Sequence, residues 1–405
     1  MRIIYLAAYF YPEKYASDFI YTSVLEELAK QNEVHVITPQ PCRGVSDEAY
    51  QNFAEYEEKN GIIIHRFKMK KESSSTLGRF LRYKKCESGY KKIVKKIGKV
   101  DFVFVASTPP TMGVFAGKLA KKLGAKFIYS LQDLFPDSLV STGILKKPSG
   151  PIWWLGTKIE KKTYALADKI AVISQNFYDN LTQKGVDKAK LALIPNFIDL
   201  GQISPIAKND NVLFEEFGID RAKFNVVYAG NMGYAQGADI ILDVAEKLKG
   251  DQKVHFVVFG GGAEYGDFET AVKERNLTNV TVNPLLPKER ISEVYSLGDA
   301  SLIICKKGVG KTALPSKTWS IMACNTPIIA SFDLDSELAE TIKRASAGVC
   351  APAGDVDGLV KAVLDLKDKP ISVCSRQYLQ ENLSKETLIK KYLELFKAEK
   401  YEFKV

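Results

Sequence analysis

Lys317 stands at the expected start of a helix, directly after a proline and a serine. The apolar run 300–305 before it predicts a buried strand, and the loop between them carries Lys306 and Lys311. Cations and the free N–H groups of a helix N-terminus would therefore meet at the carboxyl end of a parallel strand, where open α/β sheets bind phosphates. This half of the chain is thus expected to bind a phosphate-bearing ligand, with Lys317 as its main cation and Lys311 or Lys306 as a second.

Three further turns follow other strands that the pattern predicts in the same half. Gly230 and Asn231 follow the expected strand 225–229, three glycines at 260–262 follow the next strand, and the loop 283–288 follows the third. Glycine lets the backbone approach a diphosphate while helix N–H groups donate to it. One such turn is weak evidence, because packing alone explains many of them. Four strand ends that share one edge of a sheet are a more specific signal.

The composition is that of an ordinary globular protein, with 405 residues of which 46% are hydrophobic and 26% charged, enough for two domains. The first apolar stretch runs into Pro12 without the basic leader of a signal peptide, and no run reaches the roughly 18 apolar residues of a spanning helix. The six dispersed cysteines and three histidines predict neither a disulfide framework nor a zinc site. A reducing cytoplasm is the expected compartment.

Short β-branched or aromatic runs alternate with helical patterns along most of the chain, which is typical of βαβ units. The series restarts after 203–223, a stretch without a clear strand. We therefore expect an α/β fold with two Rossmann-like, doubly wound parallel sheets that face a cleft. The expected domains are 1–200 and 201–384, and the C-terminal helix, 385–405, is expected to pack back on the first domain.

Several local motifs resemble those of a known enzyme family. They are Tyr9–Glu13, Asp133–Ser138, Ala171–Ser174, Ile194–Asp199, Tyr228–Asn231 and Pro315–Lys317. On these residues the chain resembles the family 4 retaining glycosyltransferases, which have the GT-B fold, and among them a bacterial polysaccharide and O-antigen subgroup similar to fucosamine transferases. The resemblance implies an acceptor-binding first domain and a nucleotide-sugar-binding second domain. Its implied donor nucleotide-binding residues are Gly230, Asn231, Gln236, Gly261, Leu285, Leu286, Lys311, Pro315, Ser316 and Ser320.

The resemblance also implies a reaction. A metal-independent, hexosyltransferase-type enzyme would move a sugar, an N-acetylated amino or deoxy-amino sugar, from a UDP donor to a lipid-diphosphate-linked glycan in lipopolysaccharide O-antigen or capsule synthesis. No cofactor, metal ion or nucleic acid is expected. Two alternatives stay open. A nucleotide-sugar 2-epimerase on the same fold would release free product without an acceptor, and a non-catalytic, membrane-bound nucleotide-sugar sensor would bind donor without turnover.

The chain departs from the family pattern at the donor site. Asn231 and Gln236 stand where many members hold the diphosphate with an arginine and a lysine. The usual Glu-x7-Glu pair falls on Thr312 and Ser320, so neither carboxylate is present. Ser320 can still hydrogen-bond a ribose, although not as a charged acceptor. Lys317 is expected to supply the missing cation, the alternative being a surface lysine.

The reacting groups on the acceptor side are expected near Asp133. Gln132 cannot carry a proton, so the resemblance makes Asp133 the residue that orients or deprotonates the acceptor hydroxyl, together with Lys317 as the second catalytic residue. The alternative is that Asp133 caps the turn before Pro136. The other residues expected on the acceptor or sugar side are Glu13, Tyr15, Asp18 and Phe135.

Two further motifs are similar to sites of other protein classes. The stretch 308–312 resembles the end of a P-loop, but the first glycine of that motif falls on Cys305, and Pro315 crowds the following helix. The D-x-D patterns that contain Asp335 and Asp355 resemble metal-binding pairs, but both residues are well placed to cap helices. Neither an ATP site nor a metal site is predicted.

The net charge of +9 is concentrated in one segment, because 13 basic residues stand against Glu72 and Glu87 between Arg66 and Lys99. Apolar residues recur there at helical spacing, which predicts a basic amphipathic helix on an anionic membrane surface. A solvated basic face over a core-facing helix is the alternative. The membrane prediction places the protein in the cytoplasm, peripherally on the inner face of the cell membrane. The predicted membrane-facing residues are Arg82, Lys84, Lys85, Lys91, Lys92, Lys95 and Lys96.

Overall fold

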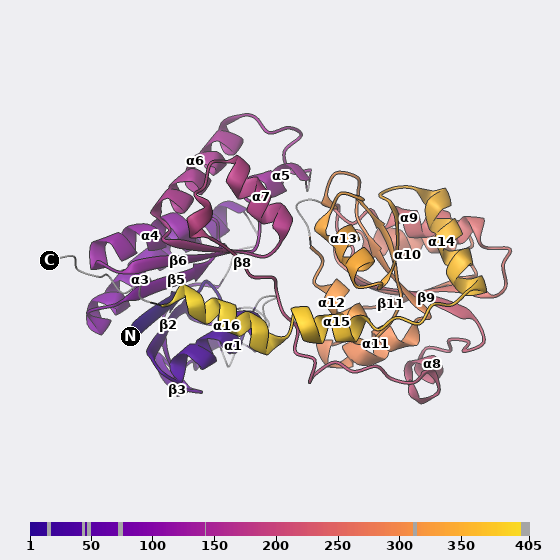
Figure 1. The fold of residues 1–405 in the computed structure, drawn as a ribbon, viewed down its shortest axis with the longest axis horizontal. Coiled ribbons are helices and arrows are strands. Elements are labelled where there is room, and N and C mark those ends of the chain that lie inside the picture. Colours follow the sequence, from indigo (N-terminus) through magenta and orange to yellow (C-terminus); the bar gives the residue numbers. More distant parts are fainter. Residues whose placement is uncertain are drawn as a thin grey trace. The chain divides into compact units, whose positions relative to one another are not determined.

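The computed structural model describes residues 1–13, 18–42, 45–46, 50–71, 76–141, 143–310 and 314–397. The chain forms two compact units, shown in Figure 1. The first comprises Met1–Pro136, Ser149–Pro195 and the described residues from Glu386 on, and the second comprises Asp137–Pro148 and Asn196–Lys385. The segment Asp137–Pro148 thus belongs to the second unit, whereas the expected boundary at 200 put it in the first.

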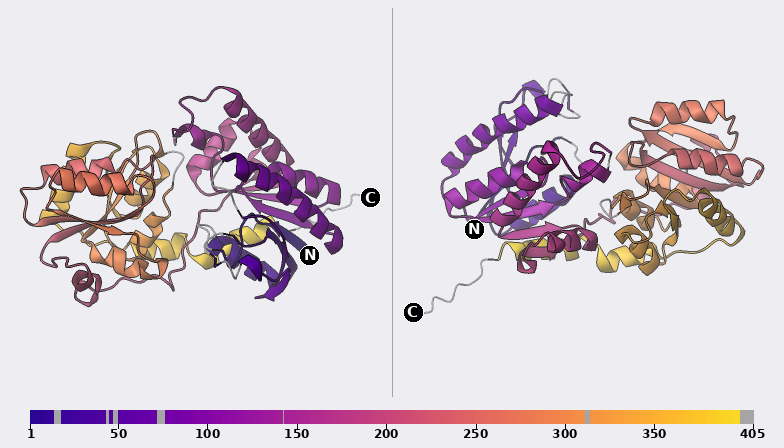
Figure 2. Two further views of the ribbon diagram at one scale, coloured as in Figure 1. Left: turned by 180° about the vertical axis from the view of Figure 1, so that it is seen from behind. Right: turned by 90° about the horizontal axis from the view of Figure 1, so that it is seen from above.

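The first unit is built on an eight-stranded sheet in the order β3-β4-β2-β1-β5-β6-β7-β8. Its central strands consist of β-branched and aromatic residues and are buried on both faces, since helices flank the sheet on both sides (Figures 1 and 2). The strands are β1 (Arg2–Leu6), β2 (Glu33–Pro39), β3 (Tyr56–Lys59), β4 (Ile62–Phe67), β5 (Phe102–Ala106), β6 (Lys126–Leu131), β7 (Lys169–Val172) and β8 (Leu191–Leu193). The helices are α1 (Asp18–Ala29), α3 (Thr76–Ile97), α4 (Met112–Leu123), α6 (Pro151–Leu166), α7 (Gln175–Gln183) and α16 (Lys385–Leu395), with a short 3-10 turn η1 (Lys188–Lys190).

The last helix, α16, completes the core of this first unit. The Tyr392 hydroxyl lies 3.1 Å from Ser130 Oγ at the end of β6. The ring of Phe396, just after α16, lies 5.5 Å from the rings of both Phe102 and Phe104 on β5. Figure 1 shows this yellow helix beside the indigo and purple elements of the first unit.

Strand β3 is the one strand of this sheet that the sequence pattern did not predict. Its sequence, Tyr-Glu-Glu-Lys, is too polar to read as a strand, and it pairs antiparallel with β4 at the exposed edge. Asn60 and Gly61 both have positive φ, 51° and 78°, as a two-residue hairpin turn requires. The Asn-Gly dipeptide was the signal that could have found it.

The second unit holds a parallel six-stranded sheet in the order β11-β10-β9-β12-β13-β14. The two doubly wound sheets expected from the sequence are confirmed, and the first is parallel apart from its edge strand β3. The strands are β9 (Phe224–Asn231), β10 (Val254–Gly261), β11 (Val280–Pro284), β12 (Ala300–Ile304), β13 (Ile328–Phe332) and β14 (Gly348–Pro352). The helices are α5 (Asp137–Ser141), α8 (Leu213–Glu216), α9 (Asp239–Lys247), α10 (Tyr265–Glu274), α11 (Ile291–Leu297), α12 (Lys317–Ala323), α13 (Glu337–Arg344), α14 (Val356–Asp368) and α15 (Ser375–Asn382), with 3-10 turns η2 (Lys208–Asp210) and η3 (Lys288–Arg290).

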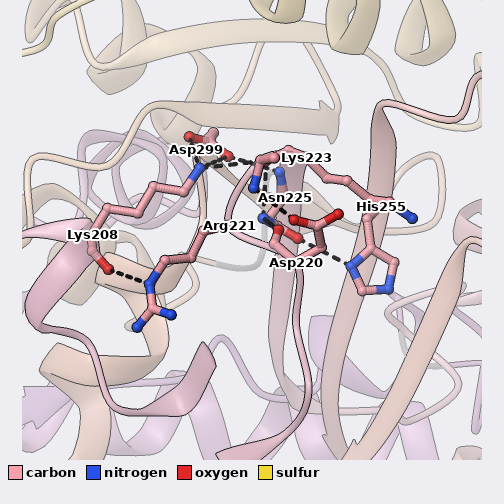
Figure 3. Close-up of polar contacts among 8 residues, drawn as sticks. Lys208, Asp220, Arg221, Lys223, Asn225, His255 and Asp299 are labelled. Atoms are coloured by element: carbon pink, nitrogen blue, oxygen red, sulfur yellow. Dashed lines mark hydrogen bonds and ion pairs between the residues drawn. The ribbon is translucent and has the colours of Figure 1, made fainter. Parts of the chain in front are cut away.

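Polar side chains close the amino-terminal edge of this second sheet, as Figure 3 shows. Asp299 accepts hydrogen bonds from Lys208 Nζ and from the Asn225 backbone N–H, each at 2.8 Å. Asn225 Oδ1 lies 3.0 Å from His255 Nδ1, and His255 Nε2 lies 2.9 Å from Thr281 Oγ1. Burial lowers the pKa of His255 to about 4. These groups pair with one another, which leaves the carboxyl-terminal edge as the place for a ligand.

Candidate active site

A cavity of about 370 Å³ lies at the carboxyl ends of the strands in the second unit. The end of β9, the loop after β11, the end of β12 and the first turn of α12 all contribute to its wall. Its volume lies within the range of about 300–1,000 Å³ that small-molecule sites occupy. The predicted donor residues that line it are Gly230, Asn231, Gln236, Leu285, Leu286, Pro315, Ser316, Lys317 and Ser320. Gly261 is not among the lining residues, and Lys311 lies outside the described residues.

Lys317 is held over an aromatic ring at the floor of this cavity. Its Nζ lies 4.1 Å from the centroid of the buried Tyr228 ring. A Cβ at Gly230, whose φ is 150°, would stand 2.5 Å from Lys317 Nζ, so any other residue there would displace the ammonium group from this position. Burial lowers the pKa of Lys317 to about 8. Within the part of the chain that the structure describes, no carboxylate pairs with it, so this cation is placed to meet an anionic ligand.

The turn after β9 is held by its own side chains. Gln236 Oε1 accepts a hydrogen bond of 3.0 Å from the Gly233 N–H, and the Tyr228 hydroxyl donates one of 2.9 Å to the Asn231 carbonyl. A Cβ at Gly262 would stand too close to the Asn231 side chain, so the neighbouring turn must also be glycine. Gln236 therefore shapes the turn. The family resemblance implies a charged residue at this place, in contact with the diphosphate.

Sequence analysis missed the second lysine of the cavity, which is Lys288 at the start of η3. Lys288 closes the loop 283–288 that had already been singled out, so its position was available from the sequence. Lys306, expected as a reserve cation, does not line the cavity: its stem packs over Gly237, and its N–H donates to the Ala235 carbonyl. The prediction for Lys306 is therefore wrong, because its backbone is tied to the turn before α9.

In the loop that resembles a P-loop, two backbone N–H groups already donate to an aspartate. Asp333 accepts hydrogen bonds from the N–H groups of Gly308 and Gly310, at 2.9 Å and 2.8 Å. These amides are consequently not free to surround a phosphate. Asp355 caps α14 through the Gly358 N–H, as predicted, whereas Ser336 caps α13 in place of Asp335. Among the described residues no cluster of His, Cys, Asp and Glu is arranged to hold a metal ion.

In the first unit, Asp133 lies two residues beyond the end of β6. The turn is fixed by a 3.0 Å hydrogen bond from the Gln132 N–H to Ser107 Oγ. The Asp133 side chain is exposed, but the surrounding protein removes part of its hydration and raises the pKa of its carboxyl above the ordinary value. Among the described residues no hydrogen bond or ion pair engages that carboxylate, so Asp133 does not cap the following turn. It is a carboxylate of raised basicity at the carboxyl edge of a sheet.

The acceptor-side predictions fare differently from one another. Glu13 is only 2% exposed, and its carboxylate accepts hydrogen bonds from the N–H groups of Phe10 and Cys42. Glu13 therefore holds loops together and does not face an acceptor, which corrects its predicted place. Phe135 is half-buried, with its ring against Gly156 of α6. Tyr15 and the side chain of Asp18 lie outside the described residues.

The basic segment forms α3, a helix of 22 residues, with Tyr90 and Val94 in the core. Arg82 is buried, and its guanidinium donates to the Lys70 carbonyl and to Cys42 Sγ, so its predicted place on the membrane surface is wrong. The arginine braces two loops instead. None of the described helices is both long and apolar enough to cross a bilayer. The exposed lysines of the helix are Lys84, Lys85, Lys91, Lys92, Lys95 and Lys96.

Comparison with known families accounts for both units. Residues 21–202 match Glycosyltransferase Family 4, and residues 209–386 match Glycosyl transferases group 1. A curated relative, the putative colanic acid biosynthesis glycosyl transferase WcaI of Escherichia coli, is 24% identical over 279 residues, which cover 68% of each chain.

Two solved structures share the whole architecture. Sucrose-phosphate synthase from Thermosynechococcus elongatus superposes with a TM-score of 0.75 at 16% identity, and the match covers 98% of both chains. Anabaena HepE, solved in complex with UDP, superposes with a TM-score of 0.72 at 13% identity, covering 98% of this chain and 99% of HepE. These similarities show that the fold is GT-B.

Proposed function

Because this chain is a glycosyltransferase with the two domains of Glycosyltransferase Family 4 and group 1, we propose that it moves a sugar from a UDP donor to a lipid-diphosphate-linked glycan. The pathway we propose is the synthesis of a bacterial surface polysaccharide, as the name of WcaI suggests for that relative. The observation that carries the proposal is the cavity of the second unit, in which the Lys317 ammonium lies against Gly230 without a carboxylate partner among the described residues. A nucleoside diphosphate supplies the missing negative charge.

The cavity has an apolar wall and a cationic part, which suit different parts of the proposed ligand. Its apolar wall, with Leu285, Ile291 and Tyr295, suits a base and ribose, while Lys317 and Lys288 suit the diphosphate. Uracil is our choice of base because HepE, which has the same fold, was solved with UDP. Ser320 is only 8% exposed and lines the same wall, where its hydroxyl can bond a ribose in place of a glutamate.

In the proposed reaction, the bond between the sugar and UDP breaks as the acceptor hydroxyl attacks from the same face. Negative charge develops on the leaving diphosphate, and a cation fixed beside it stabilises that charge without reorganising. Lys317 has this role, and no protein nucleophile or metal ion is required. Asp133, whose pKa is raised, orients the acceptor hydroxyl and accepts its proton.

The sugar and the acceptor are inferred from sequence motifs. We propose an N-acetylated amino or deoxy-amino sugar, on the strength of the Pro315–Lys317 and Asp133–Ser138 motifs shared with the polysaccharide subgroup. The exposed lysines of α3 fit an acceptor carried by an anionic membrane, and we propose that the protein works peripherally on its cytoplasmic face.

The test measures UDP binding by calorimetry, with and without chelator, and then turnover of UDP-sugars with lipid-linked acceptors. We expect UDP to bind in chelator, Lys317→Ala to lose that binding, and Lys306→Ala, a lysine just outside the cavity, to keep it. Product analysis separates the possible activities, since free epimerised sugar without acceptor would mean a 2-epimerase, and binding without any turnover would mean a sensor. Failure of UDP to bind would refute the proposal.

A further inference from the structure

A second and larger hollow lies in the first unit, beside α3. It encloses about 1340 Å³, more than the upper end of about 1,000 Å³ for an ordinary small-molecule site. One wall is α3, and the other is formed by the starts and ends of the edge strands β2, β3 and β4. We call it the α3 groove, and it is lined by lysines and apolar residues of α3 and by residues in and beside the three strands.

The groove lies where one face of β4 is only partly covered. Residues on one face of β4, such as Ile62 and Ile64, are fully buried, whereas those on the other face, such as His65 and Phe67, are only half-buried. A Cβ at Gly89 would stand 2.5 Å from the Phe67 ring, so the helix touches the sheet there. The floor is apolar, since Phe67, Met69, Ile93 and Ile97 are partly buried hydrophobic residues packed on the core.

The wall of the groove carries an excess of positive charge. Lys68, Lys85, Lys92, Lys95 and Lys96 line it, and within the described part of the chain none of the five forms an ion pair. The carboxylates in the groove are Glu33, which is paired with Arg2 and His35, and Glu55. Burial, His35 and Lys96 together lower the pKa of His65 to about 4, so it is neutral at neutral pH. The lysines carry charges of one sign along this wall, and a bound anion relieves their mutual repulsion.

From this apolar floor and unpaired lysine wall, we propose that the α3 groove binds a single anionic phospholipid, with its phosphate between the lysines and its upper acyl chain on the floor. The excess of lysines disfavours zwitterionic lipids, whose phosphate is balanced by a cationic group, and the apolar floor disfavours a free phosphate ion, which makes no use of Phe67 and Ile93. The site lies in the first unit and does not depend on which nucleotide the second unit binds.

The same helix supplies an internal control. Lys84 and Lys91 also lie on α3 and are exposed, but neither lines the groove. Lys84 pairs with Glu87 at 2.9 Å, and Lys91 Nζ lies 5.5 Å from the centroid of the Phe115 ring. If the basic helix were attracted to the membrane only by its overall charge, every exposed lysine would contribute similarly to vesicle binding. If the groove binds a lipid, the lysines that line the groove contribute more than Lys84 and Lys91.

The experiment compares two double variants of the full chain, Lys92→Glu with Lys96→Glu in the groove and Lys84→Glu with Lys91→Glu outside it. Co-sedimentation is measured with vesicles of phosphatidylcholine alone and with added phosphatidylglycerol, and with inorganic phosphate as competitor. Both pairs remove the same charge, and melting temperature and UDP affinity check that the fold is intact. We expect the groove pair to lose at least about tenfold in partitioning to anionic vesicles, because it removes two lysines that face the lipid phosphate, while the outer pair loses less than about threefold.

Three outcomes would overturn the proposal. Equal losses in the two double variants would mean general helix charge in place of a groove site. Absence of wild-type binding to phosphatidylglycerol vesicles would exclude a lipid. Full displacement by inorganic phosphate, with the melting temperature raised by phosphate alone, would make the groove a site for a soluble phosphate ligand.

Discussion

Replacement of Lys317 by alanine tests the proposed donor site most directly. The lysine Nζ lies over Tyr228 and against Gly230, and no described carboxylate competes for it. A hydrogen bond to a charged group contributes about 1.5–3 kcal/mol, so loss of the contact with a diphosphate should lower kcat/KM for the donor by roughly 10- to 150-fold. The assay is the initial rate of sugar transfer over a donor series, beside calorimetry of UDP binding.

A role in the transition state makes a sharper prediction for the same variant. If Lys317 stabilises the charge that develops on the leaving diphosphate, kcat itself falls at least about tenfold, because that interaction is stronger in the transition state than in the ground state. Lys306→Ala is the matched control, since Lys306 lies nearby but outside the cavity. Wild-type turnover of Lys317→Ala at saturating donor would refute the reasoning.

The pKa of Lys317 adds a pH signature. With a pKa of about 8, the ammonium group of the free enzyme is mostly charged below that pH and mostly neutral above it. Because kcat/KM reports ionisations of the free enzyme, it should fall about tenfold between about pH 7.5 and pH 9, and this limb should be missing in Lys317→Ala. An identical alkaline limb in both proteins would assign it to another group.

The same burial has a consequence for stability. The pKa of Lys317 is lower in the folded state than in the unfolded state, so the unfolded state binds more protons between about pH 8 and 10.5, and stability rises with pH across that window. At neutral pH the charged lysine is therefore destabilising. Lys317→Met should raise the melting temperature of the unliganded protein by a few degrees while removing UDP binding, and a lowered melting temperature would contradict this.

Three further predictions concern other parts of the molecule. Asp133→Asn should lower the transfer rate at least about hundredfold with unchanged UDP affinity, because it removes an acceptor-side base and leaves the donor cavity intact; unchanged transfer would exclude it from the mechanism. Asn225→Ala removes the partner of His255 Nδ1 and should destabilise the protein by about 1–3 kcal/mol in urea unfolding without changing the donor KM. Burial lowers the pKa of His255 and of His65 to about 4, so between about pH 6.5 and pH 4 these histidines bind protons more readily in the unfolded protein than in the folded one. Stability should therefore be lost as the pH falls through that range, and a flat melting temperature there would contradict both pKa values.

The sequence predicted the two parallel sheets because their strands are apolar runs with β-branched residues, a local property. It missed β3, whose charged residues form a strand only because β4 offers a partner edge. It also predicted most residues that line the cavity of the second unit, since they follow strand ends that a parallel sheet must bring to one edge.

Contacts between distant residues were beyond the reach of local patterns. The position of Lys317 over Tyr228 joins residues that are far apart in the chain. Glu13 and Arg82 carry charges that predict exposure, yet both are buried, because backbone N–H groups and carbonyls from other loops satisfy them. No spacing in the sequence distinguishes such a brace from a surface charge.

The position of α16 has a consequence for synthesis of the protein. Most of the first unit precedes the second in the chain, yet its core is closed by Tyr392 and Phe396, which are translated after the second unit. Until the second unit has been translated, the rings of Phe102 and Phe104 lack their contacts with Phe396, so the core of the first unit is incomplete. A frameshift or stop codon shortly before α16 would therefore damage the first unit, although most of that unit is encoded upstream of the second.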